Sequence, residues 1–248
     1  MYRVKYYYYK TNEWCIQMDY RARRVGTGKP PRGPKKKLPQ EEYAVILDFL
    51  PQGNPFDKHP EHKRSPIAQV IGDKYFTLFE LVTREGEYFE AGEKIYVGID
   101  YIGKGPIKSV SEPIEYDDLT NVAKENLPGI LENIIREKES IFVNIFNIAE
   151  PITLKMHVLE LLPGVGKKTL KAILEERKSR PFTSFKDLEE RLSLRGVKLH
   201  NPVKVLAERI LIELKGGERY YLFVRPPERA QQAVYLNYLE RLYRMAKQ

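Results

Sequence analysis

The chain has 248 residues, of which 42% are hydrophobic and 31% charged, and this balance indicates a folded globular protein rather than a disordered one. No apolar run approaches the roughly 18 residues of a membrane-spanning helix, and the single Cys15 excludes an internal disulfide framework, so we expect a cytoplasmic protein without a membrane partner. The net charge of +8 is concentrated at the start, where residues 1–39 hold 11 Lys and Arg against two acidic residues.

Residues 1–39 are predicted to form a basic, Tyr-rich arm. Aromatic rings interleaved with cations suit single-stranded nucleic acid, in which bases stack on rings and phosphates pair with cations. The four tyrosines at residues 6–9 could equally form a core strand, because tyrosine favours strands. Residues 26–37 contain no apolar side chain, which indicates a flexible arm that either contacts nucleic acid or is a solvated linker. The cations expected to contact phosphate are Arg21, Arg23, Arg24, Lys29, Arg32, Lys35, Lys36 and Lys37.

Residues 40–116 are predicted to form a small β-barrel. Short apolar runs separated by turn signals predict five strands, at residues 43–50, 67–71, 75–82, 93–99 and 107–111. Five short strands at close spacing are typical of a small barrel, and we expect an OB-like fold. OB barrels commonly bind single strands, although a fold by itself does not establish a function.

The loop after the first predicted strand carries His59 and His62, with Asp57 and Glu61 nearby. A zinc site needs about four ligands, and the whole chain offers four histidines and one cysteine. Charges of both signs are typical of a solvated loop. We therefore predict no metal site and no cofactor.

Residues 117–215 are predicted to be helical, which makes the chain an α+β protein. The expected helices lie at residues 118–136 with a division at Pro128 and Gly129, from about 153 into a turn, at 167–179, after a cap at Ser184, and at 202–214. In the remaining residues, 216–248, we expect a strand at 220–224 and an amphipathic helix at 228–247.

The most informative stretch is Leu-Pro-Gly-Val-Gly-Lys-Lys at residues 162–168, a tight glycine turn that opens a helix on two lysines. Amides in the first turn of a helix lack intrahelical partners and carry the positive end of its dipole, so they attract an anion. The anion that we expect is a backbone phosphate, although such a turn can also serve only to reverse the chain. The spacing does not match a P-loop or a dinucleotide fingerprint. The residues expected to hold phosphate are Gly164, Val165, Gly166, Lys167, Lys168 and Lys171.

This turn resembles the helix-hairpin-helix family, whose hairpin amides bind phosphates without reading sequence. A second, degraded unit around Gly196 would complete the pair of units that this family stacks. The segment from about residue 40 to 215, which opens Glu-Glu-Tyr-Ala-Val-Ile-Leu-Asp-Phe-Leu at residue 41, is similar to an archaeal family called domain of unknown function 655. This resemblance implies an OB-like region joined to a helix-hairpin-helix region, often encoded among translation genes. It favours RNA over DNA and a ribosomal subunit as partner.

An enzyme is the competing class. The adjacent carboxylates at 175–176 and 189–190 are expected to point to different faces of their helices, so they do not by themselves form a two-metal site. No Ser-His-Asp, Cys-His or His-Glu-x-x-His arrangement can be recognised. We therefore expect a noncatalytic nucleic-acid-binding protein without a small-molecule substrate. The alternatives are a DNA-binding protein and a protein-interaction adaptor in replication, repair or transcription.

Overall fold

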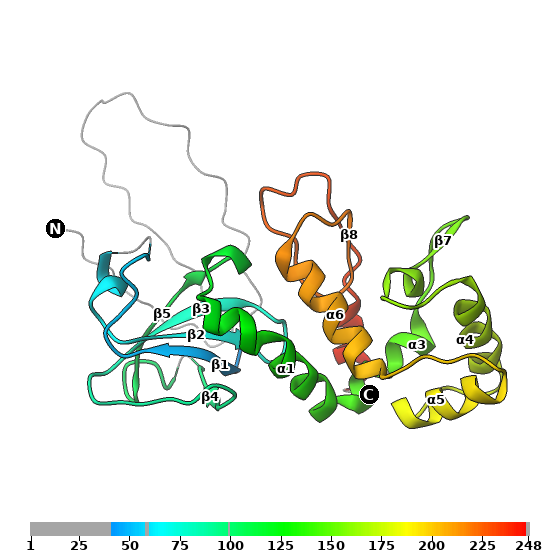
Figure 1. Cartoon of the computed structure of the whole chain (residues 1–248), viewed down its shortest axis with the longest axis horizontal. Coiled ribbons are helices and arrows are strands. Elements are labelled where there is room, and N and C mark those ends of the chain that lie inside the picture. The colour runs from blue at the N-terminus through cyan, green and yellow to red at the C-terminus, as the bar shows by residue number, and fades with distance from the viewer. Residues whose placement is uncertain (1–40, 58–59, 99, 247–248) are drawn as a thin grey trace, which may run out of the picture. The chain divides into compact units, whose positions relative to one another are not determined.

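A computed structural model describes residues 41–57, 60–98 and 100–246 of the chain (Figure 1). The basic arm falls outside these ranges. The expectations for Arg21, Arg23, Arg24, Lys29, Arg32, Lys35, Lys36 and Lys37, and for the tyrosines at 6–9, therefore concern residues outside the described part of the chain.

An antiparallel sheet is formed by all five predicted strands. They are β1 (Tyr43–Leu50), β2 (Ile67–Gly72), β3 (Leu78–Thr83), β4 (Lys94–Tyr96) and β5 (Ile107–Pro113). Their order across the sheet is β4-β1-β2-β3-β5, and the sheet curls into a half-barrel (Figure 1). The predictions of five strands and of an α+β chain are therefore confirmed.

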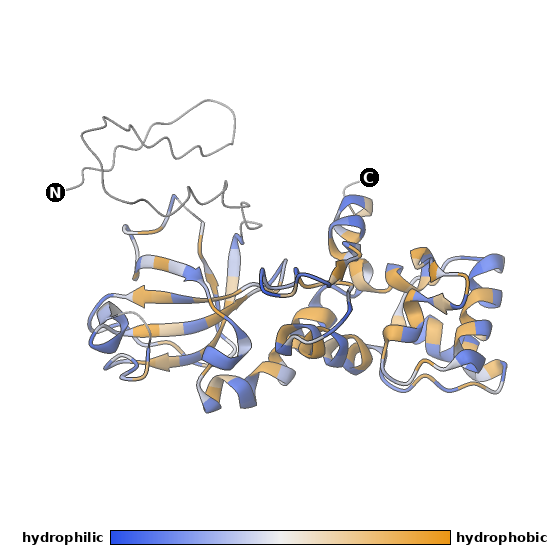
Figure 2. Cartoon of the chain, turned by 90° about the horizontal axis from the view of Figure 1, so that it is seen from above, coloured by the Kyte–Doolittle hydropathy of each residue, from blue (hydrophilic) through white to orange (hydrophobic). Residues whose placement is uncertain are grey.

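Both faces of the central strands are buried, which explains why they read as continuous apolar runs rather than as alternating ones. Along β1, Ala44 and Ile46 point into a small core inside the curl of the sheet. Val45 and Leu47, on the opposite face, join the large core shared with the helices. Figure 2 shows the resulting pattern, with apolar positions along the strands and on one side of the helices.

Helix α1 (Asn121–Glu137) packs against β1 and α6 and passes through Pro128 without a break. The predicted division at Pro128 and Gly129 is therefore wrong. The apolar face continues on both sides of the proline, with Leu127 and Leu131 fully buried. Their packing outweighs the cost of a proline inside a helix, which is about 3 kcal/mol. Thr120 caps the start of the helix, because its hydroxyl accepts a hydrogen bond from the Ala123 amide; the same hydroxyl donates one to Asp48.

The segment that leads to the glycine turn is not the helix predicted from about residue 153. Two short helices, α2 (Glu139–Phe142) and α3 (Asn144–Ile148), are followed by the two-stranded sheet of β6 (Pro151–Thr153) and β7 (Met156–His157). A single 3-10 turn, Val158–Leu161, then precedes the glycines. The pairing of β6 with β7 uses backbone N–H and C=O groups that a helix would need for its own hydrogen bonds. The predicted helix from about residue 153 therefore does not form.

Three helices follow with the bounds that local signals predict. They are α4 (Lys167–Ser179), α5 (Phe185–Leu194) and α6 (Pro202–Lys215). The predicted cap at Ser184 is confirmed, because its hydroxyl accepts a hydrogen bond from the Asp187 amide at 3.0 Å.

The C-terminal part contains a shorter helix than the one predicted at 228–247. Strand β8 (Tyr220–Tyr221) pairs in parallel with β9 (Val234–Tyr235), and α7 (Tyr238–Met245) begins only after Asn237. The Leu236 amide donates to the Tyr221 carbonyl, which draws this stretch into an extended pairing. Tyr238, Leu239 and Leu242 of α7 are buried in the large core.

The described residues, from 41 to 246, form one compact unit. Residues of β1, β2 and β3 share the large core with residues of α1 through α7, so the predicted boundary at residue 117 lies within continuous packing. Short 3-10 turns at Pro60–Lys63 and Tyr116–Asp118 flank the sheet. No helix in the described ranges is both long and apolar enough to cross a bilayer.

Glu41 clamps the turn between β2 and β3. Its carboxylate accepts hydrogen bonds from the amides of Lys74, Tyr75 and Thr77 at 3.0–3.2 Å. A Cβ on Gly72 would lie only 2.0 Å from this carboxyl group, so any larger residue there would displace the Glu41 side chain. Burial raises the pKa of Glu41 from 4.5 to about 7, against the opposing effect of the three amides.

This carboxyl group predicts a pH-dependent stability. Between pH 4.5, the pKa of the unfolded chain, and about pH 7, the folded chain holds a proton on Glu41 that the unfolded chain releases. The contribution of Glu41 is therefore present below pH 4.5 and is lost as the pH rises through about 7, by about 3 kcal/mol. We expect Glu41→Gln to remove this fall. Denaturant unfolding of both proteins at several pH values measures it, and equal pH slopes would contradict the expectation.

Candidate nucleic-acid interface

The glycine turn before α4 is tight and partly built into the core. Gly164 has a φ of +79°, a conformation that L side chains rarely adopt. The next residue, Val165, is buried, and its amide donates to the Leu162 carbonyl at 3.1 Å. Val165 was predicted to hold phosphate, but its amide already has this partner and its side chain packs in the large core.

The start of α4 is open to a ligand. Gly166 occupies the capping position in an extended conformation, and no side chain in the described part of the chain caps this end. A Cβ on Gly166 would meet no described atom within 4 Å other than those of its chain neighbours, so there is room for a side chain at this position. The amides of Lys167 and Lys168 follow directly, and first-turn amides have no carbonyl partner within their helix. An anion placed there would also interact favourably with the helix dipole.

Three exposed lysines surround this helix end. The Lys167 ammonium lies 2.6 Å from the Glu160 carboxylate, and this contact holds the pKa of Glu160 below its usual range. Lys168 donates to the Gly196 carbonyl at 3.3 Å, whereas Lys171 lies 3.9 Å from Glu175 one turn along the helix. Exposed ion pairs of this kind contribute little, typically below about 1 kcal/mol. These ammonium groups can therefore exchange their present partners for a phosphate.

The second turn, around Gly196, contacts the first turn, but the helix that follows it is capped differently. Gly196, with a φ of +66°, ends α5, and its carbonyl receives the Lys168 ammonium. The following helix, α6, is capped by the Asn201 side chain, which accepts from the Lys204 amide at 3.1 Å. Pro202, at the first helical position, has no amide hydrogen to offer. The start of α6 thus has a side-chain cap, in contrast to the start of α4.

Helices α4 and α5 are held together behind the turn by Arg191. Its guanidinium is buried, lies 4.4 Å from the centre of the Phe182 ring and contacts the Glu176 carboxylate at 3.0 Å. Arg195 adds a contact to Glu175 at 2.7 Å and a second contact to Glu176. These contacts give the glycine turn a fixed support.

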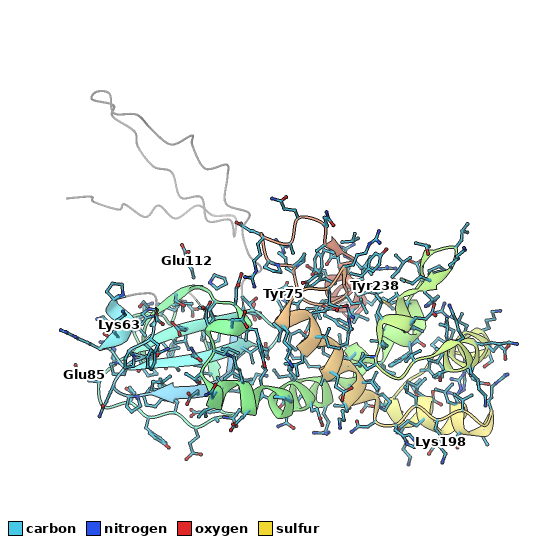
Figure 3. All side chains as sticks on the ribbon, turned by 45° about the horizontal axis from the view of Figure 1, so that its top comes forward. Lys63, Tyr75, Glu85, Glu112, Lys198 and Tyr238 are labelled. Atoms are coloured by element: carbon cyan, nitrogen blue, oxygen red, sulfur yellow. The ribbon has the colours of Figure 1, made fainter. Side chains whose placement is uncertain are left out.

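Five of the six residues predicted at the turn are exposed, namely Gly164, Gly166, Lys167, Lys168 and Lys171. Sequence analysis missed Glu160, which draws the Lys167 ammonium toward the turn. Its carboxylate also accepts from the His157 amide, and this His-x-x-Glu capping pattern was the available signal. Lys198, which follows Gly196 in the second turn, is exposed beside α5 (Figure 3).

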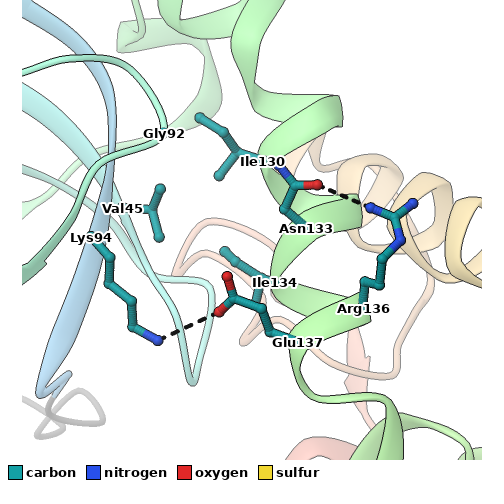
Figure 4. Close-up of a pocket in the computed structure, with 8 residues that line it drawn as sticks. All are labelled: Val45, Gly92, Lys94, Ile130, Asn133, Ile134, Arg136 and Glu137. Atoms are coloured by element: carbon teal, nitrogen blue, oxygen red, sulfur yellow. Dashed lines mark hydrogen bonds and ion pairs between the residues drawn. The ribbon is translucent and has the colours of Figure 1, made fainter.

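A separate pocket of about 280 Å³ lies between β1, the loop before β4, and α1 (Figure 4). Its cations are already paired. Lys94 contacts Asp73 at 2.8 Å and Glu137 at 3.7 Å, and Arg136 donates to Asn133 at 3.0 Å. The pocket therefore offers a mixed polar rim and no cluster of free charge, and we assign it no ligand.

Residues 40–225 match the family described as a protein of unknown function, DUF655. The chain belongs to this family. It is 40% identical over 204 residues to the uncharacterized protein MJ0038 of Methanocaldococcus jannaschii, across 81% of this chain and 88% of that one. The crystal structure of the DUF655 protein Af1531 from Archaeoglobus fulgidus is similar with a TM-score of 0.64 and 42% identity, over 75% of this chain and all of that one. The predicted resemblance to this archaeal family is thereby confirmed.

Proposed function

We propose that this DUF655 protein is a noncatalytic nucleic-acid-binding protein that holds a backbone phosphate at the start of α4. The observation that carries the proposal is an uncapped helix end, Gly166, with exposed lysines at 167, 168 and 171 around it. Backbone amides and a helix dipole bind phosphate without reading bases. Specificity would then depend on the shape of the nucleic acid or on other surfaces of the protein.

The arrangement of the elements supports the finer parts of the proposal. Two turns, each with a left-handed glycine, precede α4 and α6, as expected of paired helix-hairpin-helix units. A half-barrel with strand order β4-β1-β2-β3-β5 is compatible with an OB-like region, because the five-stranded OB fold is a partly open barrel. The adjacent carboxylates Glu175 and Glu176 are engaged by Arg195 and Arg191, which argues against their use as metal ligands of a nuclease.

We propose RNA rather than DNA as the target, in the cytoplasm and in association with a ribosomal subunit. The sequence of residues 1–39 interleaves tyrosine with Lys and Arg, and such composition suits unpaired bases and their phosphates. Direct competition between an RNA stem-loop and DNA of the same sequence tests this choice. Tighter binding of the DNA would contradict it.

The substitution Gly166→Asp tests the site itself. The capping position has open space and an extended backbone, so an aspartate there can accept the first-turn amides that a phosphate would use. We expect the free energy of unfolding to rise by about 0.3–1 kcal/mol. RNA affinity is expected to fall about tenfold or more, since a hydrogen bond to a charged group contributes about 1.5–3 kcal/mol. Fluorescence anisotropy with a labelled stem-loop and denaturant unfolding measure the two effects.

Gly166→Ala is the matched control, because it adds a Cβ without an acceptor or a charge. We expect its affinity to stay within about twofold of the unchanged protein, as the first-turn amides remain open. Equal RNA affinities of the Asp and Ala variants would contradict the proposed phosphate site. The absence of any RNA binding at low salt would contradict the proposed function.

A further inference from the structure

A second candidate site lies on the half-barrel, away from the turns of the helical part. A cavity of about 690 Å³ is lined by the loop after β1, by β3 and by the segment between β5 and α1. Glu112, on β5, marks one side of it (Figure 3). The lining is strongly acidic, with the carboxylates of Asp57, Glu80, Glu112, Glu115, Asp117 and Asp118.

Two of these carboxylates, those of Asp57 and Glu80, lie next to a third side chain, that of His62. The His62 Nδ1 atom lies 2.7 Å from Glu80 Oε2 and 3.4 Å from Asp57 Oδ2. A ligand atom from each residue lies within 4.8 Å of the other two. The side chains of Asp57, His62 and Glu80 are only 7%, 8% and 2% exposed, unlike carboxylates gathered on a surface.

The three groups are held in place by the fold. Glu80 lies on β3 opposite Gln69 of β2, whose amide donates to the Glu80 Oε1 atom at 2.9 Å. This contact leaves the other carboxylate oxygen directed at His62. The loop closes on itself, because the Asn54 amide donates to the His62 carbonyl at 2.8 Å. A Cβ on Gly53 would lie 2.5 Å from that carbonyl, so the closure requires a glycine with its φ of +80°.

The chemistry of the set favours a cation. Two carboxyl groups and one imidazole nitrogen meet at a buried place, and this mixture of oxygen and nitrogen donors is one that divalent ions bind. A divalent ion would neutralise both carboxylates and leave His62 neutral, the form in which imidazole binds metals. One imidazole nitrogen with two carboxylate oxygens suits first-row ions such as Mn²⁺ and Zn²⁺.

We propose that Asp57, His62 and Glu80 bind a divalent transition-metal ion of the class of Mn²⁺ and Zn²⁺. The cavity beside them has room for water molecules that complete the coordination. Sequence analysis predicted no metal here because the chain has few histidines and cysteines and the loop carries charges of both signs; it did not include Glu80, which follows His62 by 18 positions. The ion would join the loop to the sheet and stabilise the folded chain by mass action.

Metal titration of the full-length protein tests this site. After chelation and dialysis, Mn²⁺ binding is followed by the loss of its free spectrum in electron paramagnetic resonance, and Zn²⁺ binding by calorimetry. We expect one ion per chain and a thermal unfolding midpoint that rises with metal concentration. Glu80→Gln and Asp57→Asn are each expected to weaken binding by about tenfold or more.

Asp117→Asn is the matched control, because Asp117 is an exposed carboxylate of the same cavity outside the converging set. It removes the same charge and is expected to leave the affinity within about twofold. The proposal is overturned if no saturable binding occurs, or if all three variants bind equally. Gly166→Asp is expected to bind metal normally, so a failure of the metal site and a failure of the phosphate site remain distinguishable.

Discussion

Replacing Glu213 by alanine is expected to lower the free energy of unfolding by about 3–5 kcal/mol. The carboxylate lies on α6 and is 1% exposed. It accepts hydrogen bonds from three consecutive amides, those of residues 222–224, at 2.8–2.9 Å. It also pairs with Arg209 at 2.9 Å, one turn earlier on the same helix. Alanine would leave the three amides and a buried guanidinium without their acceptor.

Because of Arg209, Glu213→Ala is expected to lower the free energy of unfolding by more than the loss of one ion pair would. Its guanidinium also donates to Glu218 at 3.0 Å, to the Leu161 carbonyl at 3.4 Å and to the Tyr220 carbonyl. The group therefore links α6 to the segment that carries β8 and to the residue that precedes the glycine turn. Disturbing Glu213 disturbs all of these contacts together.

Glu208→Ala provides the control for this prediction. Glu208 lies on the same helix, but its side chain is 47% exposed and its contact with Lys204 is 4.0 Å long. Surface pairs of this kind contribute about 0.3–0.5 kcal/mol. Unfolding in guanidinium chloride compares the three proteins, and a loss below about 1 kcal/mol for Glu213→Ala would contradict the prediction.

The second large effect is expected on nucleic-acid affinity. We predict that changing Lys167, Lys168 and Lys171 together to glutamate weakens binding of an RNA stem-loop by about 100-fold at moderate salt. The three ammonium groups surround the open end of α4, and their reversal places three carboxylates next to the proposed phosphate. Each lost phosphate contact also reduces the slope of log affinity against log salt by about 0.7–0.9.

A matched triple variant changes the same charge elsewhere. Lys63, Lys178 and Lys186 are exposed and lie outside the two turns. We expect their reversal to reduce affinity much less, since charges farther from the contact act through screened interactions. Anisotropy titrations at several salt concentrations give both the affinity and the slope. Equal losses in the two triple variants would show that only total charge matters, and would remove the turn from the binding surface.

Several elements could be predicted from the sequence because their signals are local. The apolar runs of the five strands, separated by Gly and Pro, were sufficient to place the strands of the half-barrel. The bounds of α4 followed from Gly166 before it and Pro181 after it, and the cap at Ser184 from its own side chain. In each case the deciding contacts lie within about four residues along the chain.

Other elements depend on partners that are distant in the sequence. Helix α1 continues through Pro128 because its apolar face packs on β1 and α6 on both sides of the proline. The terminal helix starts only at Tyr238 because the residues of β9, which were predicted to be helical, pair with β8 as a strand. Local propensity predicted a helix break near Pro128 and a helix start near residue 228. Tertiary packing overrode both preferences.

The candidate sites divide in the same way. The sequence by itself determined the glycine turn that we propose as a phosphate site, because its glycines and lysines lie close together along the chain, around one helix end. Only the tertiary structure decided that Val165 belongs to the core and that its amide bonds to Leu162. Only the structure brought Glu80 to His62, since a strand's register with its neighbours sets the face on which each side chain lies. Burial and pairing between distant segments are properties of the packed chain, and a local pattern of residues does not contain them.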